Sequence, residues 1–189
     1  HCHSQYSDGG SSIADMATAA QHLGLQYLGI SDHSQSNTYA GGLSRDDITA
    51  QHAEIDGLNA EYAARGVRFR LLKGIEADIL PCGRLDYDAS CLESFDFVIG
   101  SIHTRYGMNE RQMTDRVLKA LDDPHLTILG HPTGRLLLTR EPYAIDMDAV
   151  LEKAAAVGAA VELNADPHRL DIDWRACRRA AHYGTLISI

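Results

Sequence analysis

The chain has 189 residues, of which 44% are hydrophobic and 23% charged, values typical of a globular protein with one domain and a substantial core. Its formal net charge of −9 argues against a protein that binds a nucleic acid backbone by its own positive charge. No apolar run reaches the ~20 residues that cross a bilayer. The four cysteines have no paired spacing, which predicts reduced thiols in a cytoplasmic protein without membrane attachment.

Helical and extended patterns alternate along the chain. Capping residues and apolar spacings of three and four predict helices at residues 11–24, 44–65, 110–121, 146–157 and 173–183. Apolar runs predict strands at residues 25–30, 67–75, 95–100, 126–130, 159–163 and 185–189, with a polar loop at 34–43 and a hairpin turn at 80–85. This alternation predicts parallel strands joined by crossover helices.

Residues of the types that commonly bind metals lie at or after the ends of several predicted strands. They are His33, Glu76, His103 and His131. In an open doubly wound sheet, only the strands beside a switch point reach one site. In an α/β barrel, the C-terminal end of every strand faces the same mouth. The number of such residues therefore favours a barrel over an open sheet.

The first three residues add two imidazoles, His1 and His3, which would point the same way from an extended strand end. The candidate metal ligands are His1, His3, Asp8, His33, Glu76, His103 and His131. Because one site uses three or four protein ligands, seven imply at least two ions, with Glu76 a natural bridging carboxylate. Mixed nitrogen and oxygen ligands suit zinc, manganese or iron. Closely spaced divalent ions hold a phosphate and activate water.

Several of these residues have an equally ordinary reading. The histidine pair could lie on a frayed terminus, and Asp8, which precedes two glycines, could serve only a turn. Asp32 either caps the adjoining loop or orients a ligand. Arg135, Arg140 and Arg169 lie in loops after strand ends and are either surface charges or phosphate contacts. No Ser-His-Asp set and no glycine-rich phosphate loop stands out.

Taken together, the motifs resemble those of the polymerase and histidinol phosphatase (PHP) superfamily. They are His1-Cys2-His3, Ser7-Asp8-Gly9, Ser31-Asp32-His33, Gly74-Ile75-Glu76, Ser101-Ile102-His103 and Gly130-His131-Pro132. The stretches at residues 74–80, 131–137 and 162–171 resemble more closely the C-terminal PHP domain of bacterial family X DNA polymerases.

The resemblance implies a distorted seven-stranded (β/α) barrel with up to three divalent ions, manganese foremost and zinc or iron as alternatives. In this family pattern, one ion is held by His1, His3 and Glu76, a second by Asp8 and His33, and a third by Glu76, His103 and His131. Family members of this type are manganese-dependent 3′-5′ exonucleases, and related domains are phosphatases of small phosphate esters.

Two departures from the family pattern concern this chain. Cys82 stands in a hairpin turn where close relatives have Asp. The family pattern also includes a strand ahead of the first histidine pair and a closing Asp-x-His, which we expect outside residues 1–189. The resemblance therefore predicts a PHP domain excerpt truncated at both ends, with a polymerase core on the same parent chain.

We therefore expect a metal-dependent phosphoesterase acting on DNA 3′ ends, with Glu76 and His131 in catalysis and Arg135 and Arg169 on the substrate phosphate. The alternatives are a small-molecule phosphatase of the histidinol phosphatase kind and a non-catalytic, metal-stabilised scaffold. The complete set of visible ligands counts against the scaffold, because a scaffold does not need a water-accessible site for several ions.

Overall fold

The computed structural model describes residues 1–189 and shows an α/β fold with six parallel strands in the order β1-β2-β3-β4-β5-β6. The strands are β1 Tyr27–His33, β2 Arg70–Asp78, β3 Phe97–Ser101, β4 Ile128–Leu129, β5 Ala160–Glu162 and β6 Leu186–Ser188. The helices are α1 Ile13–His22, η1 Thr38–Ala40, α2 Arg45–Ala64, α3 Ala89–Leu92, α4 Glu110–Ala120, α5 Met147–Val157 and α6 Trp174–Tyr183. Strand order follows chain order, as in a barrel, but the sheet is not closed.

The chain divides into two compact units. The first consists of His1–Glu76 and Tyr87–Val98, and the second of Ala77–Asp86 and Ile99–Ile189. The boundary passes through β2 and β3, so both strands contribute to both units. Each unit is described by itself below.

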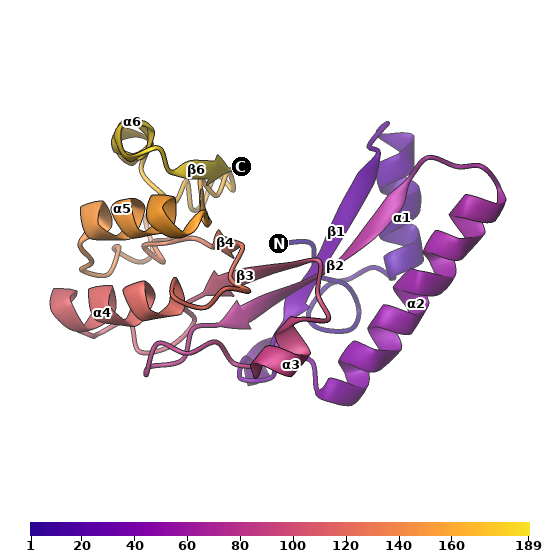
Figure 1. Cartoon of the computed structure of the whole chain (residues 1–189), viewed down its shortest axis with the longest axis horizontal. Coiled ribbons are helices and arrows are strands. Elements are labelled where there is room, and N and C mark those ends of the chain that lie inside the picture. The colour runs from indigo at the N-terminus through magenta and orange to yellow at the C-terminus, as the bar shows by residue number, and fades with distance from the viewer. The chain divides into compact units, whose positions relative to one another are not determined.

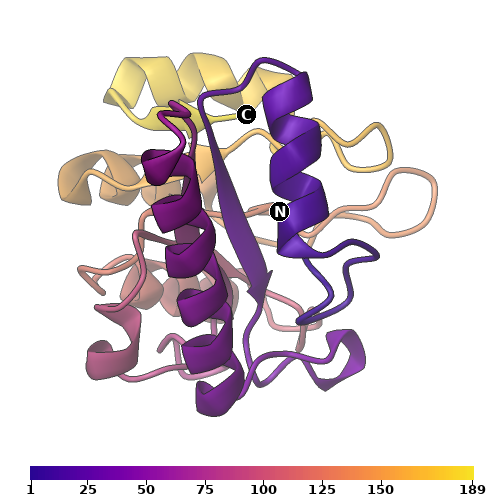
Figure 2. The ribbon, with the colours of Figure 1, turned by 90° about the vertical axis from the view of Figure 1, so that its right-hand side faces the viewer.

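In the first unit, α1 and α2 flank β1 and bury one face of β1 and β2 (Figure 2). Ser12 caps α1 through the Asp15 amide, and Ser44 with Asp47 forms a capping box at the start of α2. The core contains Ile13, Ala17, Ala20, Ile30, Ile55, Tyr62, Phe69 and Leu71, all less than a tenth exposed. Such burial stabilises by about 1.5–3 kcal/mol for each large apolar side chain.

In the second unit, α5 packs against both α4 and α6 (Figure 1). Asp146 and Asp173 cap the starts of α5 and α6. The buried Arg116 of α4 donates to the carbonyl oxygens of Ile79, Leu80 and Thr104, and so ties the 80–85 turn to the chain after β3. Burial lowers the pKa of its guanidinium, but an arginine keeps its charge at any physiological pH.

Most sequence predictions of secondary structure are confirmed. The five predicted helices begin and end within two residues of the observed bounds, and the antiparallel Ile79–Leu85 pair confirms the hairpin. The short helices η1 and α3 were not predicted. The sheet has six strands where the resemblance implied seven. All four cysteines are free, as expected. No helix combines the length and apolar character that a membrane span requires.

The prediction that His1 and His3 lie on a strand end is wrong, because no strand includes residues 1–3. The Cys2 carbonyl accepts from the Ser31 amide at 3.0 Å, as in a strand pair. The Cys2 amide, however, donates to the Ser31 Oγ at 2.9 Å instead of to a backbone carbonyl. The segment is thus held beside β1 without completing a ladder.

Candidate metal centre

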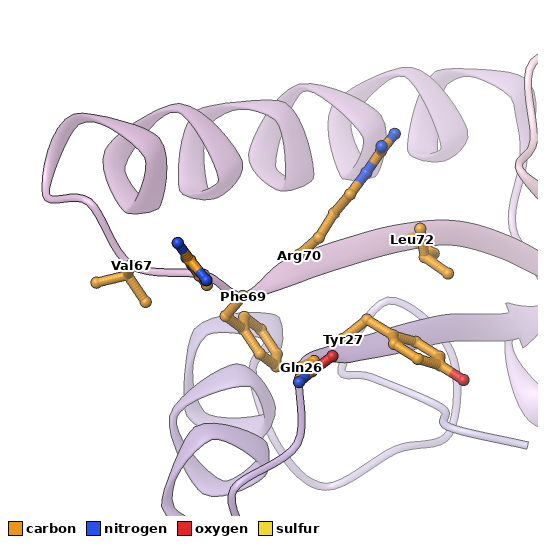
Figure 3. A pocket seen from close by; sticks show the side chains of 7 residues that line it. Gln26, Tyr27, Val67, Phe69, Arg70 and Leu72 are labelled. Atoms are coloured by element: carbon orange, nitrogen blue, oxygen red, sulfur yellow. The ribbon is translucent and has the colours of Figure 1, made fainter.

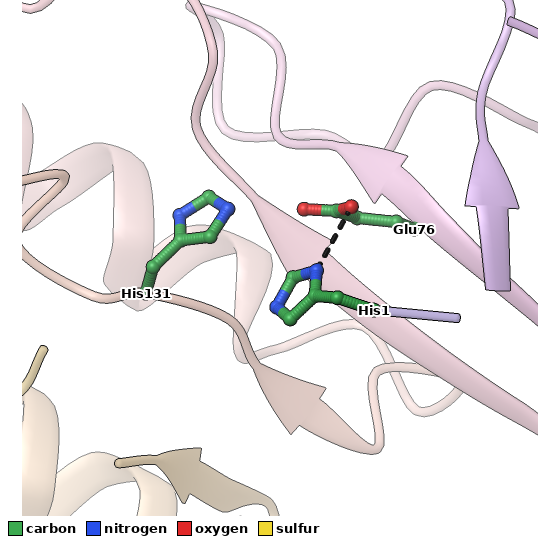
Figure 4. A group of neighbouring side chains, drawn as sticks. All are labelled: His1, Glu76 and His131. Carbon is green, nitrogen blue, oxygen red and sulfur yellow. Dashed lines mark ion pairs between the residues drawn. The ribbon is translucent and has the colours of Figure 1, made fainter. Parts of the chain in front are cut away.

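In the first unit, three imidazoles surround one oxygen of Glu76. The Glu76 Oε2 lies 3.0 Å from His1 Nδ1, 3.4 Å from His3 Nε2 and 3.5 Å from His33 Nδ1. Figure 4 shows the His1–Glu76 pair. The parallel register of β1 and β2 sets His33 directly beside Glu76 on the neighbouring strand. Glu76 is fully buried, and a buried carboxylate charge requires compensation by nearby polar groups or a bound cation.

A second group, formed by His3, Asp8 and His33, shares two of those histidines. Asp8 lies 3.9 Å from His3 Nδ1 and 3.7 Å from His33 Nε2, and the two imidazole rings stack at 4.3 Å. The ligand atoms all lie within 4.8 Å of one another. Ligands of one tetrahedral ion at ~2.0–2.2 Å stand roughly 3.5 Å apart, so this spacing fits a shared cation.

The state of His3 also fits a cation. Its Nδ1 is buried and has no hydrogen-bond partner. Burial lowers the pKa of His3, while the neighbouring Glu76 acts in the opposite direction. A pKa below the ordinary ~6.5 keeps the imidazole neutral at pH 7, which is the form that binds metal. An orphaned, neutral ring nitrogen facing a carboxylate indicates a metal ligand.

Asp32 builds the loop that carries His3 and Asp8. Its buried carboxylate accepts from the Ser4 amide and the Ser4 hydroxyl, each at 2.6 Å, from the Ser7 hydroxyl at 2.5 Å and from the Gln51 amide at 2.6 Å. Within the loop, the Gly9 amide donates to the Ser4 carbonyl, and a Cβ at Gly9 would stand 2.0 Å from the His3 carbonyl oxygen. Asp32 therefore holds the loop that carries His3 and Asp8 in position. The sequence had left open whether Asp32 caps the adjoining loop or orients a ligand, and these hydrogen bonds favour the second role.

The second unit holds His103 and His131, whose ring centroids are 5.2 Å apart. The buried Asp78 lies 2.6 Å from His103 Nδ1. Such a carboxylate fixes the ring's orientation and raises its basicity. The His131 amide donates to the Glu162 Oε2 at 2.5 Å. His131, also drawn in Figure 4, thus sits in a loop after β4 that β5 anchors.

The loops that follow β4 and β5 are tied together. Asp171 accepts from the Thr133 amide and hydroxyl at 3.0 and 2.9 Å, and burial raises the pKa of its carboxyl. Arg135 donates to the Arg169 carbonyl at 2.9 Å and to the Leu170 carbonyl, and pairs with Asp173 at 3.5 Å. The guanidinium of Arg135 thus makes structural contacts within the protein. Arg169, in contrast, has a buried Nη1 without a hydrogen-bond partner.

Some supporting residues were not singled out from the sequence. Asp78 lies two residues after Glu76 on the same strand, so its side chain points to the same face, and that spacing was a usable signal. Ser4, Glu162 and Asp171 gave no such signal, because their partners are 28 to 38 residues away in the chain.

A surface pocket of about 490 Å³ lies at the N-terminal ends of β1 and β2 (Figure 3). Gln26, Tyr27, Val67, Arg68, Phe69, Arg70 and Leu72 line it. It contains none of the metal-binding residue types and lies at the starts of the strands, whereas His33 and Glu76 lie toward their ends. It is therefore separate from the candidate metal centre.

Comparison with known proteins agrees with the observed fold. The family model of the PHP domain matches residues 1–165, and the chain belongs to this family. It is 44% identical over 189 residues to the DNA polymerase/3′-5′ exonuclease PolX of Bacillus subtilis (strain 168). That match covers all of this chain and 32% of PolX, so the chain spans about a third of that relative.

Other relatives are phosphatases by name. The chain is 31% identical over 157 residues to a protein of Syntrophotalea carbinolica named "Probable phosphatase", covering 82% of this chain and 59% of that protein. Among solved structures, a Listeria monocytogenes protein assigned as the histidinol phosphatase HisK has a TM-score of 0.69 at 12% identity. That comparison covers 99% of this chain and 91% of the other, and it shows the shared fold.

Proposed function

We propose that this chain is a metal-dependent phosphoesterase that hydrolyses terminal phosphodiesters at DNA 3′ ends. The observation that carries the proposal is the buried Glu76 oxygen with three imidazole nitrogens within 3.5 Å, beside the His3–Asp8–His33 group. Whole-chain similarity to PolX supports DNA as the substrate. The net charge of −9 supports a polymerase core on the parent chain as the part that holds most of the DNA.

Up to three divalent ions, manganese foremost, are proposed for the centre. His1, His3 and Glu76 would hold one, and Asp8 with His33 a second. Glu76, His103 and His131 would hold a third. The last set is supported by the position of each residue at or just after the end of a parallel strand. Bound ions of this kind supply an activated water and neutralise charge on the phosphate.

The side chains have distinct proposed roles in this reaction. Glu76 and His131 would each help to hold the ions, which would supply an activated water and neutralise charge on the reacting phosphate. Arg169 is proposed as a phosphate contact because its buried Nη1 lacks a partner in the protein. For Arg135, a phosphate contact is still proposed from the sequence. Its guanidinium already makes three contacts within the fold, which favour Arg169 over Arg135 as the main phosphate contact.

A second candidate function is hydrolysis of small phosphate monoesters. It is favoured by the relatives named as phosphatases, which align with this chain over 157 and 163 residues. A non-catalytic scaffold is disfavoured by the donor set itself. A scaffold gains nothing from a buried carboxylate with three imidazoles around one oxygen, because hydrophobic packing would stabilise it at least as well.

One assay separates these functions. The purified protein with manganese is given a 3′-labelled single-stranded oligonucleotide and, in parallel, a small alkyl phosphate monoester. We expect release of mononucleotides with kcat/KM at least tenfold above that for the monoester. Arg169→Ala is expected to raise KM without changing metal content. Preference for the monoester would replace the exonuclease by a phosphatase, and activity on neither would favour the scaffold.

A further inference from the structure

The second unit carries an aromatic and cationic cluster that the metal centre does not use. The rings of Tyr106 and Tyr143 stack at a centroid distance of 6.1 Å with an interplanar angle of 18°. The guanidinium of Arg140 lies over the Tyr106 ring, with Cζ 4.3 Å from the ring centroid. An Arg–Tyr stack of this kind presents flat, polarisable surfaces.

The cluster is hydrogen-bonded to the residues that adjoin the two histidines of this unit. Tyr106 follows His103 by three residues, and its hydroxyl donates to the Ile102 carbonyl at 3.3 Å. The Tyr143 hydroxyl donates to the carbonyl of Pro132, next to His131, at 2.7 Å. A nucleotide whose phosphate lies at His103 and His131 would therefore have its base within reach of these rings.

Tight packing makes the cluster rigid. Gly134 has a φ of +63°, and a Cβ there would stand 2.7 Å from Tyr143 Cε1 and 3.4 Å from Tyr106 Cε1. The Gly134 carbonyl accepts from Arg140 Nε at 2.7 Å. The glycine thus lets both rings approach the backbone and holds the guanidinium in place. A pre-organised surface loses little conformational entropy when a ligand binds.

Arg140 differs from the nearby Arg135 in how many of its guanidinium nitrogens have a hydrogen-bond partner in the protein. All three nitrogen groups of Arg135 contact the fold, through two carbonyls and Asp173. Arg140 uses only Nε, and both of its Nη groups are without a protein partner. Tyr106 and Arg140 are each partly exposed. A half-exposed guanidinium that is oriented but not satisfied points to a ligand.

We propose that Tyr106 and Arg140 form a stacking shelf for the nucleobase of the nucleotide whose phosphodiester is hydrolysed. The proposal rests on the proposed function and deepens it by naming a nucleotide, rather than a sugar or amino alcohol phosphate, as the substrate class. Bases of any sequence stack on aromatic rings and on guanidinium planes. The shelf therefore binds single-stranded 3′ ends without selecting a sequence.

The test is a binding measurement that does not require turnover. Fluorescence anisotropy with calcium in place of manganese gives the Kd of the protein for two labelled single-stranded tetranucleotides. One has an ordinary 3′-terminal nucleotide and the other an abasic 3′-terminal sugar. The variants are Tyr106→Leu, which removes the flat ring, Tyr106→Phe, which keeps it, and Arg140→Gln. Tyr27→Leu is the control, since Tyr27 is exposed at the start of β1.

For the base-bearing strand, Tyr106→Leu and Arg140→Gln are each expected to weaken binding roughly 5- to 100-fold, as loss of one base stack does. Binding of the abasic strand should change less than twofold, and Tyr106→Phe and Tyr27→Leu should match the parent. Equal loss on both strands, or no loss on either, would overturn the shelf. Absent hydrolysis in manganese would count against the proposed function alone, because the binding comparison stands without it.

Discussion

Replacing Glu76 by glutamine is expected to lower phosphodiester hydrolysis by about 10³-fold or more, beyond the 10–100-fold that follows loss of a supporting outer partner. Glutamine keeps the size of the side chain but removes the negative charge at Oε2. That oxygen is the one point that His1, His3 and His33 all approach within 3.5 Å. Without the carboxylate, the ions proposed to share it lose their bridge.

The measurement for Glu76→Gln combines initial rates on the labelled oligonucleotide with metal content after desalting. Circular dichroism and thermal melting should match the parent, because the amide fills the same buried volume. Glu61→Gln, on the exposed surface of α2, is the matched control and should retain full activity. A pure Glu76→Gln protein with parental rates would remove Glu76 from the catalytic centre.

The Asp32→Ala substitution is expected to destabilise the protein by roughly 3–5 kcal/mol. It leaves the Ser4 amide, the Ser4 hydroxyl and the Gln51 amide without their acceptor, and both residues are fully buried. Each buried donor left unpaired costs about 1–3 kcal/mol. For a chain of this size, the loss lowers Tm by about 6–20 °C. Metal affinity should fall as well, because the same bonds hold the loop that carries His3 and Asp8.

Chemical denaturation monitored by circular dichroism measures the stability loss of Asp32→Ala. Glu61→Gln again serves as control and should stay within ~0.5 kcal/mol of the parent. Asp32→Asn should show an intermediate loss, because one oxygen remains an acceptor while the new amide faces donors. If Asp32→Ala melted with the parent, the four hydrogen bonds would not hold the ligand loop.

The helices were predictable because their signals are local. Ser44, Asp146 and Asp173 cap helices within three residues of their own positions, so the sequence around them contains the whole interaction. The parallel pairing of the strands was also predictable, since alternating helices and strands restrict the topology to a few parallel arrangements. Donor-type residues at successive strand ends then favoured a barrel.

The rest depends on partners far along the chain. Nothing near Arg135 reveals that the carbonyls of Arg169 and Leu170 occupy its guanidinium, because they lie 34 and 35 residues away. The backbone of His1 and His3 was misjudged for a related reason. The Cys2 amide donates its hydrogen bond to the side chain of Ser31 and not to a backbone carbonyl. Sequence periodicity does not show where a side chain replaces a backbone group as hydrogen-bond acceptor.

The most direct test of the proposed metal centre is a crystal structure of the protein grown with manganese, with anomalous diffraction recorded to locate the ions. The account predicts at least two ions, one held by His1, His3 and Glu76 and another held by Asp8 and His33. It also predicts that His103 and His131 bind an ion that Glu76 shares. Manganese found only on surface carboxylates, with Glu76 and its three histidines free of metal, would contradict the account.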